Sequence, residues 1–231
     1  MNINLTLKNT TAFLALTFVM HEAHEIVHTA VGRLICGCWG ERDFNLWGLC
    51  EGCIEAHPTS LIATFVGPLF TFIMIWIGLY LMRKNENESN LAIGFALIFS
   101  NMPFARIFTA AIGGDEVYGL SQMMENYEMA WAIGLISIIF ITFYPLLIAY
   151  SVIEKNRIGW FLLFFIVPMI IDLLVVLGGL NALLAAGVGS ETWILGSPII
   201  VTIWTFFVFL TLGFTARFLP SLNNAEMETK L

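Results

Sequence analysis

Hydrophobic residues along this chain form long continuous runs, separated by short polar or glycine-containing connectors. A helix needs about 20 apolar residues to cross the hydrocarbon core of a bilayer, and each run approaches or exceeds that length. A β-barrel would show short alternating segments instead. The pattern predicts six helices, over 11–35, 59–82, 91–112, 128–153, 159–182 and 192–218. The fifth is expected to break early, at Gly178 and Gly179.

The composition agrees with a membrane protein. Hydrophobic residues make up 58% of the chain and charged residues only 12%, against about 25% charged residues in soluble domains. We therefore expect an all-α polytopic membrane protein, a bundle of about six transmembrane helices forming one membrane-embedded domain over 1–231. Residues 11–120 would form the core of this domain and 128–218 accessory helices. The first run leads into polar residues without a small-residue cleavage site, so no cleavable signal is expected.

The charges predict an orientation and exclude one class of partner. A net charge of −7 argues against nucleic-acid binding, which leaves the lipid bilayer as the expected surroundings. An even number of spans places both termini on one side, and basic residues favour the cytosolic side. Arg33 and Arg42 lie opposite the termini. Seven basic residues lie with the termini: Lys8, Arg83, Lys84, Lys155, Arg157, Arg217 and Lys230. We expect a multi-pass protein of the plasma membrane with cytosolic termini.

The first apolar run contains an unusual polar cluster. Five titratable residues occur within eight positions: His21, Glu22, His24, Glu25 and His28. Each ionised carboxylate near the bilayer centre costs about 2.5–3.5 kcal/mol on insertion scales. A metal ion is the simplest partner that would compensate this cost. Burial for packing alone and a non-catalytic metal or proton pathway are the alternatives.

His24-Glu25-Ile26-Val27-His28 has the pattern H-E-x-x-H. On a helix, His24 and His28 lie one turn apart on one face and can bind one Zn²⁺. Glu25 lies on the same side, where it can take a proton from an activated water. His21 and Glu22 are expected to line a polar cavity beside this unit.

A catalytic zinc site needs a third protein ligand. Asp115 is the preferred candidate, because the preceding Gly113-Gly114 pair would let the chain turn back toward the first helix. Asp172, deep in the fifth run, is the main rival, since an acid within a membrane span is a functional candidate by default. It could equally form an ion pair with Arg106. His57, in the loop before the second run, is a further option.

The third run contains two residues that point to a polar cavity. Pro103 must disturb this helix and free a backbone carbonyl. Asn101 could then donate to a substrate carbonyl as charge develops on it, or form a hydrogen bond between helices.

All four cysteines lie in the first connector, at Cys36, Cys38, Cys50 and Cys53. Disulfides are expected if this loop is extracytoplasmic, and a structural zinc site if it is cytosolic. Four unpaired cysteines are the remaining alternative.

Three segments resemble the site-2 protease family of intramembrane metalloproteases. The matching segments are His24–Leu34, Phe65-Val66-Gly67-Pro68-Leu69, and Asn101-Met102-Pro103 followed by Gly113-Gly114-Asp115. The resemblance implies that His24, His28 and Asp115 bind zinc and that Glu25 is the general base. Asn101 would assist the oxyanion or hold unwound substrate.

The chain departs from the family pattern in the third segment. Asp115 follows Asn101 by fourteen positions and precedes Glu116 rather than glycine. On a straight helix Asp115 would lie on the order of 10 Å above the histidine pair. Zinc binding therefore requires a kink at Pro103 or a turn at the glycines. The orientation expected from the basic residues also differs from that of the family.

The predicted function is that of a zinc-dependent intramembrane endopeptidase, a metalloprotease that hydrolyses peptide bonds in transmembrane segments of other proteins. The alternative is a membrane metal transporter or sensor that uses the His/Glu-rich first helix. A zinc hydrolase acting on lipid is a third possibility that the same ligands would support.

Overall fold

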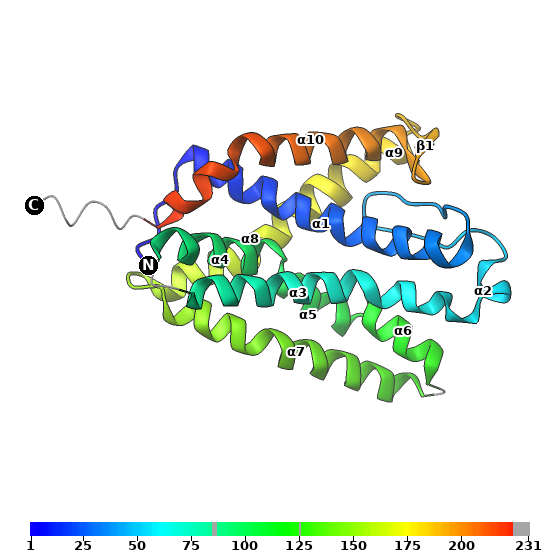
Figure 1. Ribbon diagram of the computed structural model, residues 1–231, viewed down its shortest axis with the longest axis horizontal. Coiled ribbons are helices and arrows are strands. Elements are labelled where there is room, and N and C mark those ends of the chain that lie inside the picture. The colour runs from blue at the N-terminus through cyan, green and yellow to red at the C-terminus, as the bar shows by residue number, and fades with distance from the viewer. Residues whose placement is uncertain (85–86, 125, 224–231) are drawn as a thin grey trace, which may run out of the picture.

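The computed structural model describes residues 1–84, 87–124 and 126–223; Lys230 lies outside them. Long helices run along the molecule, and one long segment crosses behind them obliquely (Figure 1). The elements are α1 (Leu7–Cys36), α2 (Cys53–Ala56), the 3₁₀ turn η1 (Pro58–Ile62), α3 (Ala63–Arg83), α4 (Glu88–Ser100), α5 (Pro103–Ala111), α6 (Asp115–Met123), α7 (Tyr127–Ser151), α8 (Arg157–Asp172), the π-helix η2 (Leu173–Leu180), α9 (Asn181–Ala185), β1 (Thr192–Ile194), β2 (Ser197–Pro198), α10 (Ile199–Thr215) and the 3₁₀ segment η3 (Ala216–Leu222).

Five helical segments are long and apolar enough to cross a membrane. They correspond to the last five of the six predicted spans and cover Pro58–Arg83, Glu88–Ala111, Tyr127–Ser151, Arg157–Ala185 and Ile199–Leu222. The fold is therefore mostly helical, as expected, with the composition of a multi-pass membrane protein. The fifth predicted span does not break at Gly178-Gly179: the helix continues through η2 and α9 to Ala185, so that expectation is wrong.

Helix α1 is the central helix of the bundle. A capping box at its start satisfies two backbone amides: that of Thr6 donates to the Asn9 side chain and that of Asn9 to the Thr6 side chain. Gly37 ends it in the left-handed conformation, with φ of 78°. Between these ends α1 packs against α3, α4 and α10. This position turns its polar residues toward protein rather than lipid.

Both ends of the described chain lie at one end of the bundle (Figure 1). Ile3 forms a β-bridge with Asn223, and the Asn4 amide donates to the Leu222 carbonyl at 3.1 Å. The first and last described residues are therefore neighbours in the fold.

The third predicted span is broken, as the position of Pro103 predicted. Helix α4 ends at Ser100, Met102 adopts a left-handed conformation with φ of 46°, and α5 starts at Pro103. A second turn follows α5, where Gly113 has φ of 96° and the Gly114 amide donates to the Thr109 carbonyl at 2.7 Å. Helix α6 begins directly after this turn.

The connector after α1 covers the end of the bundle opposite the termini (Figure 1). Two disulfides close it, Cys36–Cys53 and Cys38–Cys50, which confirms the disulfide prediction over the zinc and free-thiol alternatives. Within the loop, Asp43 Oδ1 accepts the amides of Asn45 and Leu46 at 2.9 and 2.8 Å.

Candidate metal centre

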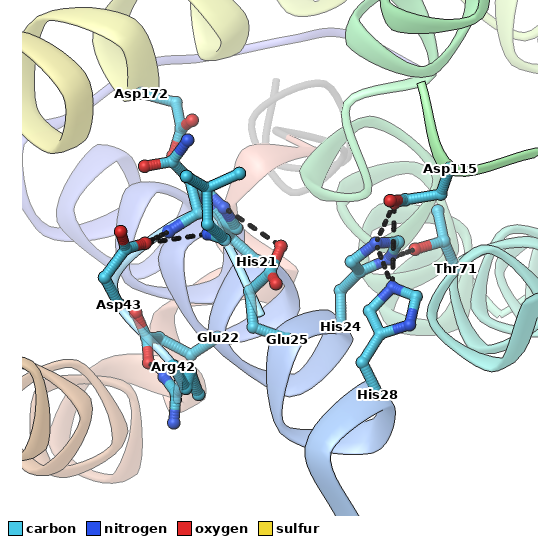
Figure 2. Close-up of polar contacts among 12 residues, drawn as sticks. His21, Glu22, His24, Glu25, His28, Arg42, Asp43, Thr71, Asp115 and Asp172 are labelled. Atoms are coloured by element: carbon cyan, nitrogen blue, oxygen red, sulfur yellow. Dashed lines mark hydrogen bonds and ion pairs between the residues drawn. The ribbon is translucent and has the colours of Figure 1, made fainter. Parts of the chain in front are cut away.

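His24, His28 and Asp115 come together at one point of the structure (Figure 2). The two imidazole Nε2 atoms are 3.1 Å apart. Asp115 Oδ2 lies 3.4 Å from His24 Nε2 and 3.6 Å from His28 Nε2. Helix α1 supplies both histidines one turn apart, and Asp115 is the first residue of α6.

The two irregularities of the third span explain how Asp115 reaches the histidines. A straight helix would have carried this residue on the order of 10 Å beyond them. The break before Pro103 separates α5 from α4, and the turn at Gly113 and Gly114 then starts a new helix, α6, which packs against α3 and α7. The first residue of α6, Asp115, reaches the two histidines. Both the kink and the glycine turn that the sequence required are therefore present.

The hydrogen bonds of the histidines define which nitrogens carry lone pairs. His28 Nδ1 lies 2.6 Å from the carbonyl oxygen of Ala63. A carbonyl only accepts, so Nδ1 carries the proton and Nε2 of the neutral ring carries a lone pair. His24 Nε2 lies 3.2 Å from Nη1 of Arg106, which only donates, so this Nε2 also carries a lone pair. His24 Nδ1 then donates to Thr71 Oγ1 at 2.9 Å.

Two lone pairs and a carboxylate oxygen thus converge at distances of 3.1–3.6 Å. Such a set repels itself unless a cation lies between its members. Metal-bound histidines usually donate their other ring N–H to a carbonyl or another oxygen, as His24 and His28 do here. Two imidazoles and one carboxylate are a donor set that can hold a metal ion.

The His28 ring occupies a narrow slot between α3 and the disulfide-closed loop. A β-carbon at Gly67 would lie 2.1 Å from His28 Nε2, so only glycine permits this approach. On another side the Trp47 indole stacks on the imidazole, with centroids 4.5 Å apart and planes at 7°. The Gly67 element of the sequence therefore acts by making space for a candidate ligand.

Gly67→Ala is expected to lower metal affinity at least 100-fold, because the new methyl group would occupy the position of His28 Nε2. Mutations of residues that only orient a metal ligand already lower metal affinity by about 10–100-fold. Titration with Co²⁺, followed by its visible absorption, measures the affinity. Gly213→Ala in α10 is the matched control, since a β-carbon there meets nothing within 4 Å. Equal affinities for the two variants would contradict the proposed packing.

Glu25 lies beside the metal centre and remains without a complete set of partners. Its side chain is buried and lines the cavity, between His21 and His24 in Figure 2. Oε1 is 3.9 Å from His21 Nε2, and Oε2 has no hydrogen-bond partner in the described part of the chain. A buried carboxylate oxygen of this kind is free to accept a proton from a molecule in the cavity.

Asp172 lies away from the metal centre. Its Oδ1 atom is 2.7 Å from His21 Nδ1, so it is placed neither as third ligand nor as the partner of Arg106. The guanidinium of Arg106 instead lies 3.8 Å from Asp115 Oδ2. The alternative of an Asp172–Arg106 ion pair is therefore wrong, because Asp172 contacts His21 and Arg106 contacts Asp115. His57 is exposed at the start of η1.

Glu22 points to the opposite side of α1 from the cavity. It forms a buried ion pair with Arg42 from the first loop and accepts a hydrogen bond from Thr205 Oγ1 of α10 at 2.5 Å. Its expected position as a cavity residue is therefore wrong, whereas His21 does line the cavity. Both residues were expected on a broad polar face of the helix, and the loop that carries Arg42 supplies the partner that Glu22 contacts instead.

Asn101 lies on the cavity wall at the break between α4 and α5. Its Nδ2 donates to the Leu97 carbonyl at 2.7 Å, and Oδ1 is buried without a partner among the described residues. The side-chain donor therefore caps its own helix in this structure. The alternative hydrogen bond between helices is not the one that forms.

A cavity of about 1110 Å³ opens beside the centre. The metal-site residues His24 and Asp115 form part of its wall, together with α5, α8, η2 and the disulfide-closed loop. A volume of this size is sufficient for an extended peptide segment of several residues.

Four residues of this site were not predicted to lie here from the sequence: Arg106, Thr71, Gly67 and Trp47. An arginine within an apolar run was the available signal for the first, and the glycine before Pro68 for the third. Comparison with known proteins found no matching family model, no similar curated protein and no similar solved structure. The geometry of the centre therefore carries the functional argument.

Proposed function

We propose that this protein is a zinc-dependent intramembrane endopeptidase, with α1 as a sixth transmembrane helix of the bundle. The observation that carries the proposal is the convergence of His24 Nε2, His28 Nε2 and Asp115 Oδ2. A buried acid, Glu25, adjoins this group in the wall of a large cavity. Metal ligands, a proton acceptor and space for a peptide are the components that metal-assisted peptide hydrolysis requires.

His24, His28 and Asp115 would hold the metal. Zinc, when bound, supplies Lewis acidity and lowers the pKa of a coordinated water. Glu25 takes the proton of the attacking water through its free oxygen and passes it to the leaving amide nitrogen. Asn101, at the cavity wall, would hold the unwound substrate backbone. The backbone must be unwound because an intact helix keeps its carbonyls in hydrogen bonds.

The surroundings of the cavity support a membrane-embedded partner. The five long apolar segments place the cavity within a bundle suited to a lipid bilayer. The expected substrate is therefore a transmembrane segment of another protein. Disulfides form in oxidising compartments, so the two bonds at Cys36–Cys53 and Cys38–Cys50 support an extracytoplasmic loop and cytosolic termini. The plasma membrane is the location that we propose.

Asp115→Asn tests the assignment of the metal centre. The variant keeps the shape of the side chain but lacks the charge, so we expect zinc content to fall below one tenth of the wild-type value. Cleavage of a single-span peptide in liposomes should be lost with it. Such a peptide should carry Asn-Gly at its centre to help it unwind, with products identified by mass spectrometry.

Asp172→Asn is the matched control, because Asp172 is also a buried cavity acid but pairs with His21. It should retain zinc. Loss of zinc in the Asp172 variant and not in the Asp115 variant would contradict the ligand assignment. If vesicles that contain the wild-type protein take up zinc but cleave no peptide, the result would favour transport over proteolysis.

A further inference from the structure

Arg106 is a charged residue in an otherwise apolar helix, and it reaches the metal centre. It lies in α5 and lines the cavity, with a side chain that is 18% exposed. Its Nη1 atom is 3.2 Å from His24 Nε2 and 3.8 Å from Asp115 Oδ2. A charge within an apolar span is expensive and is a functional candidate by default.

A guanidinium and a divalent cation compete for the same lone pairs. His24 Nε2 cannot accept from Arg106 and bind a metal at once, because its single lone pair serves one partner. With a divalent cation bound at this point, the guanidinium would be repelled from His24, because like charges repel. The adjacent space is the cavity, which Arg106 already lines. The arginine would then point its N–H groups toward a substrate held there.

Asn101, the residue that family resemblance would place near the oxyanion, has its donor occupied. Its Nδ2 is bound to the Leu97 carbonyl at 2.7 Å. Arg106, in contrast, lines the cavity and has its guanidinium at the centre, with Nη1 beside His24 Nε2. A guanidinium carries five N–H donors in a planar group. Preorganised donors of this kind stabilise the charge that develops on a carbonyl oxygen.

We propose that Arg106 is a catalytic residue that binds the oxygen of the scissile carbonyl, an assignment that rests on the proposed peptidase function. Water attack forms a C–O bond and moves the carbonyl π electrons onto oxygen, where Arg106 donates hydrogen bonds to the negative charge. When the carbonyl re-forms, the C–N bond breaks and its electron pair leaves with nitrogen, which takes the proton held by Glu25.

Arg106→Gln is the direct test. The turnover number should fall by about 10²–10³-fold, the range for loss of an oxyanion donor, with KM changed by less than about fivefold. Co²⁺ affinity should be equal to or higher than that of the wild type, because the competing cation is gone. The affinity of the Co²⁺-loaded protein for a phosphinic peptide, an anionic tetrahedral mimic, should fall by about 10²-fold.

Two further variants make the test specific. Arg106→Lys keeps the charge, and its turnover number should be about tenfold higher than that of Arg106→Gln. If the Arg106→Gln protein does not accumulate, Arg106→Lys is compared directly with the wild type. Arg83→Gln removes an exposed arginine that donates to Tyr144 and should behave as wild type.

Turnover of Arg106→Gln within about threefold of wild type, or unchanged phosphinic-peptide affinity, would overturn the assignment. Failure of the proposed function is a separate result: metal-loaded wild type would then cleave no peptide. The phosphinic-peptide titration would still decide whether Arg106 binds an anionic oxygen at the centre.

Discussion

Glu25→Gln is expected to abolish peptide cleavage while the metal stays bound. The amide has the size of the carboxylate but does not accept a proton, so the attacking water loses its base. General acid–base groups contribute about 10²–10⁴-fold to turnover, and we expect a decrease of at least that range. His24, His28 and Asp115 are unchanged in this variant, so metal content should match the wild type. Turnover and metal content should be measured on the same purified sample.

Glu51→Gln is the matched control for this experiment. Glu51 also lines the cavity, but it is exposed on the disulfide-closed loop. The same chemical change there should leave turnover within twofold of wild type. A Glu25→Gln protein that keeps more than one tenth of wild-type turnover would refute the assignment of Glu25 as the base. Equal losses in both variants would point to the charge of the cavity rather than to one residue.

Arg42→Met is expected to have the largest effect on stability. Arg42 and Glu22 form an ion pair in which each side chain is 2% exposed. Removing one partner leaves the other charge buried and unpaired, which costs about 3–5 kcal/mol. The hydrogen bond from Thr205 to Glu22 offsets only part of this cost. We expect a lower unfolding temperature in detergent, followed by circular dichroism of the helices.

A double variant separates loss of the pair from loss of the side chain. Arg42→Met combined with Glu22→Leu removes both charges, and replacing a buried pair by apolar residues is often neutral. The double variant should therefore recover most of the lost stability. Arg217→Met, at an exposed arginine that stacks on Phe218, should cost less than about 1 kcal/mol. A double variant less stable than Arg42→Met alone would contradict the charge argument.

Much of the helical framework was predictable from the apolar runs, because run length and continuity report directly on helices that suit a bilayer. The break at Pro103 was also predictable, since proline removes a backbone donor and clashes with the preceding turn. Helical periodicity placed His24 and His28 on one face. The glycine pair before Asp115 indicated where the chain turns back toward them.

Partners that come from other elements were not predictable in the same way. The position of Asp172 on its helix was clear, but its neighbour depended on how α8 packs against α1, and it proved to be His21. A pair between Arg106 and Asp172 was an open alternative because both are costly in a span, yet the turn after α5 brought Asp115 close to Arg106. Arg42 reaches Glu22 through an irregular loop, for which periodicity gives no position.

The two disulfides lower the conformational entropy of the loop that lies against the metal centre. Trp47, whose indole stacks on His28, lies inside both loops that the disulfides Cys36–Cys53 and Cys38–Cys50 close. The two bonds therefore limit the conformations that the chain can adopt on either side of Trp47. A tethered group has a high effective concentration at its target, since little motional freedom remains to be lost. Trp47 is therefore held over the imidazole at low entropic cost, and His28 keeps one orientation before any metal arrives.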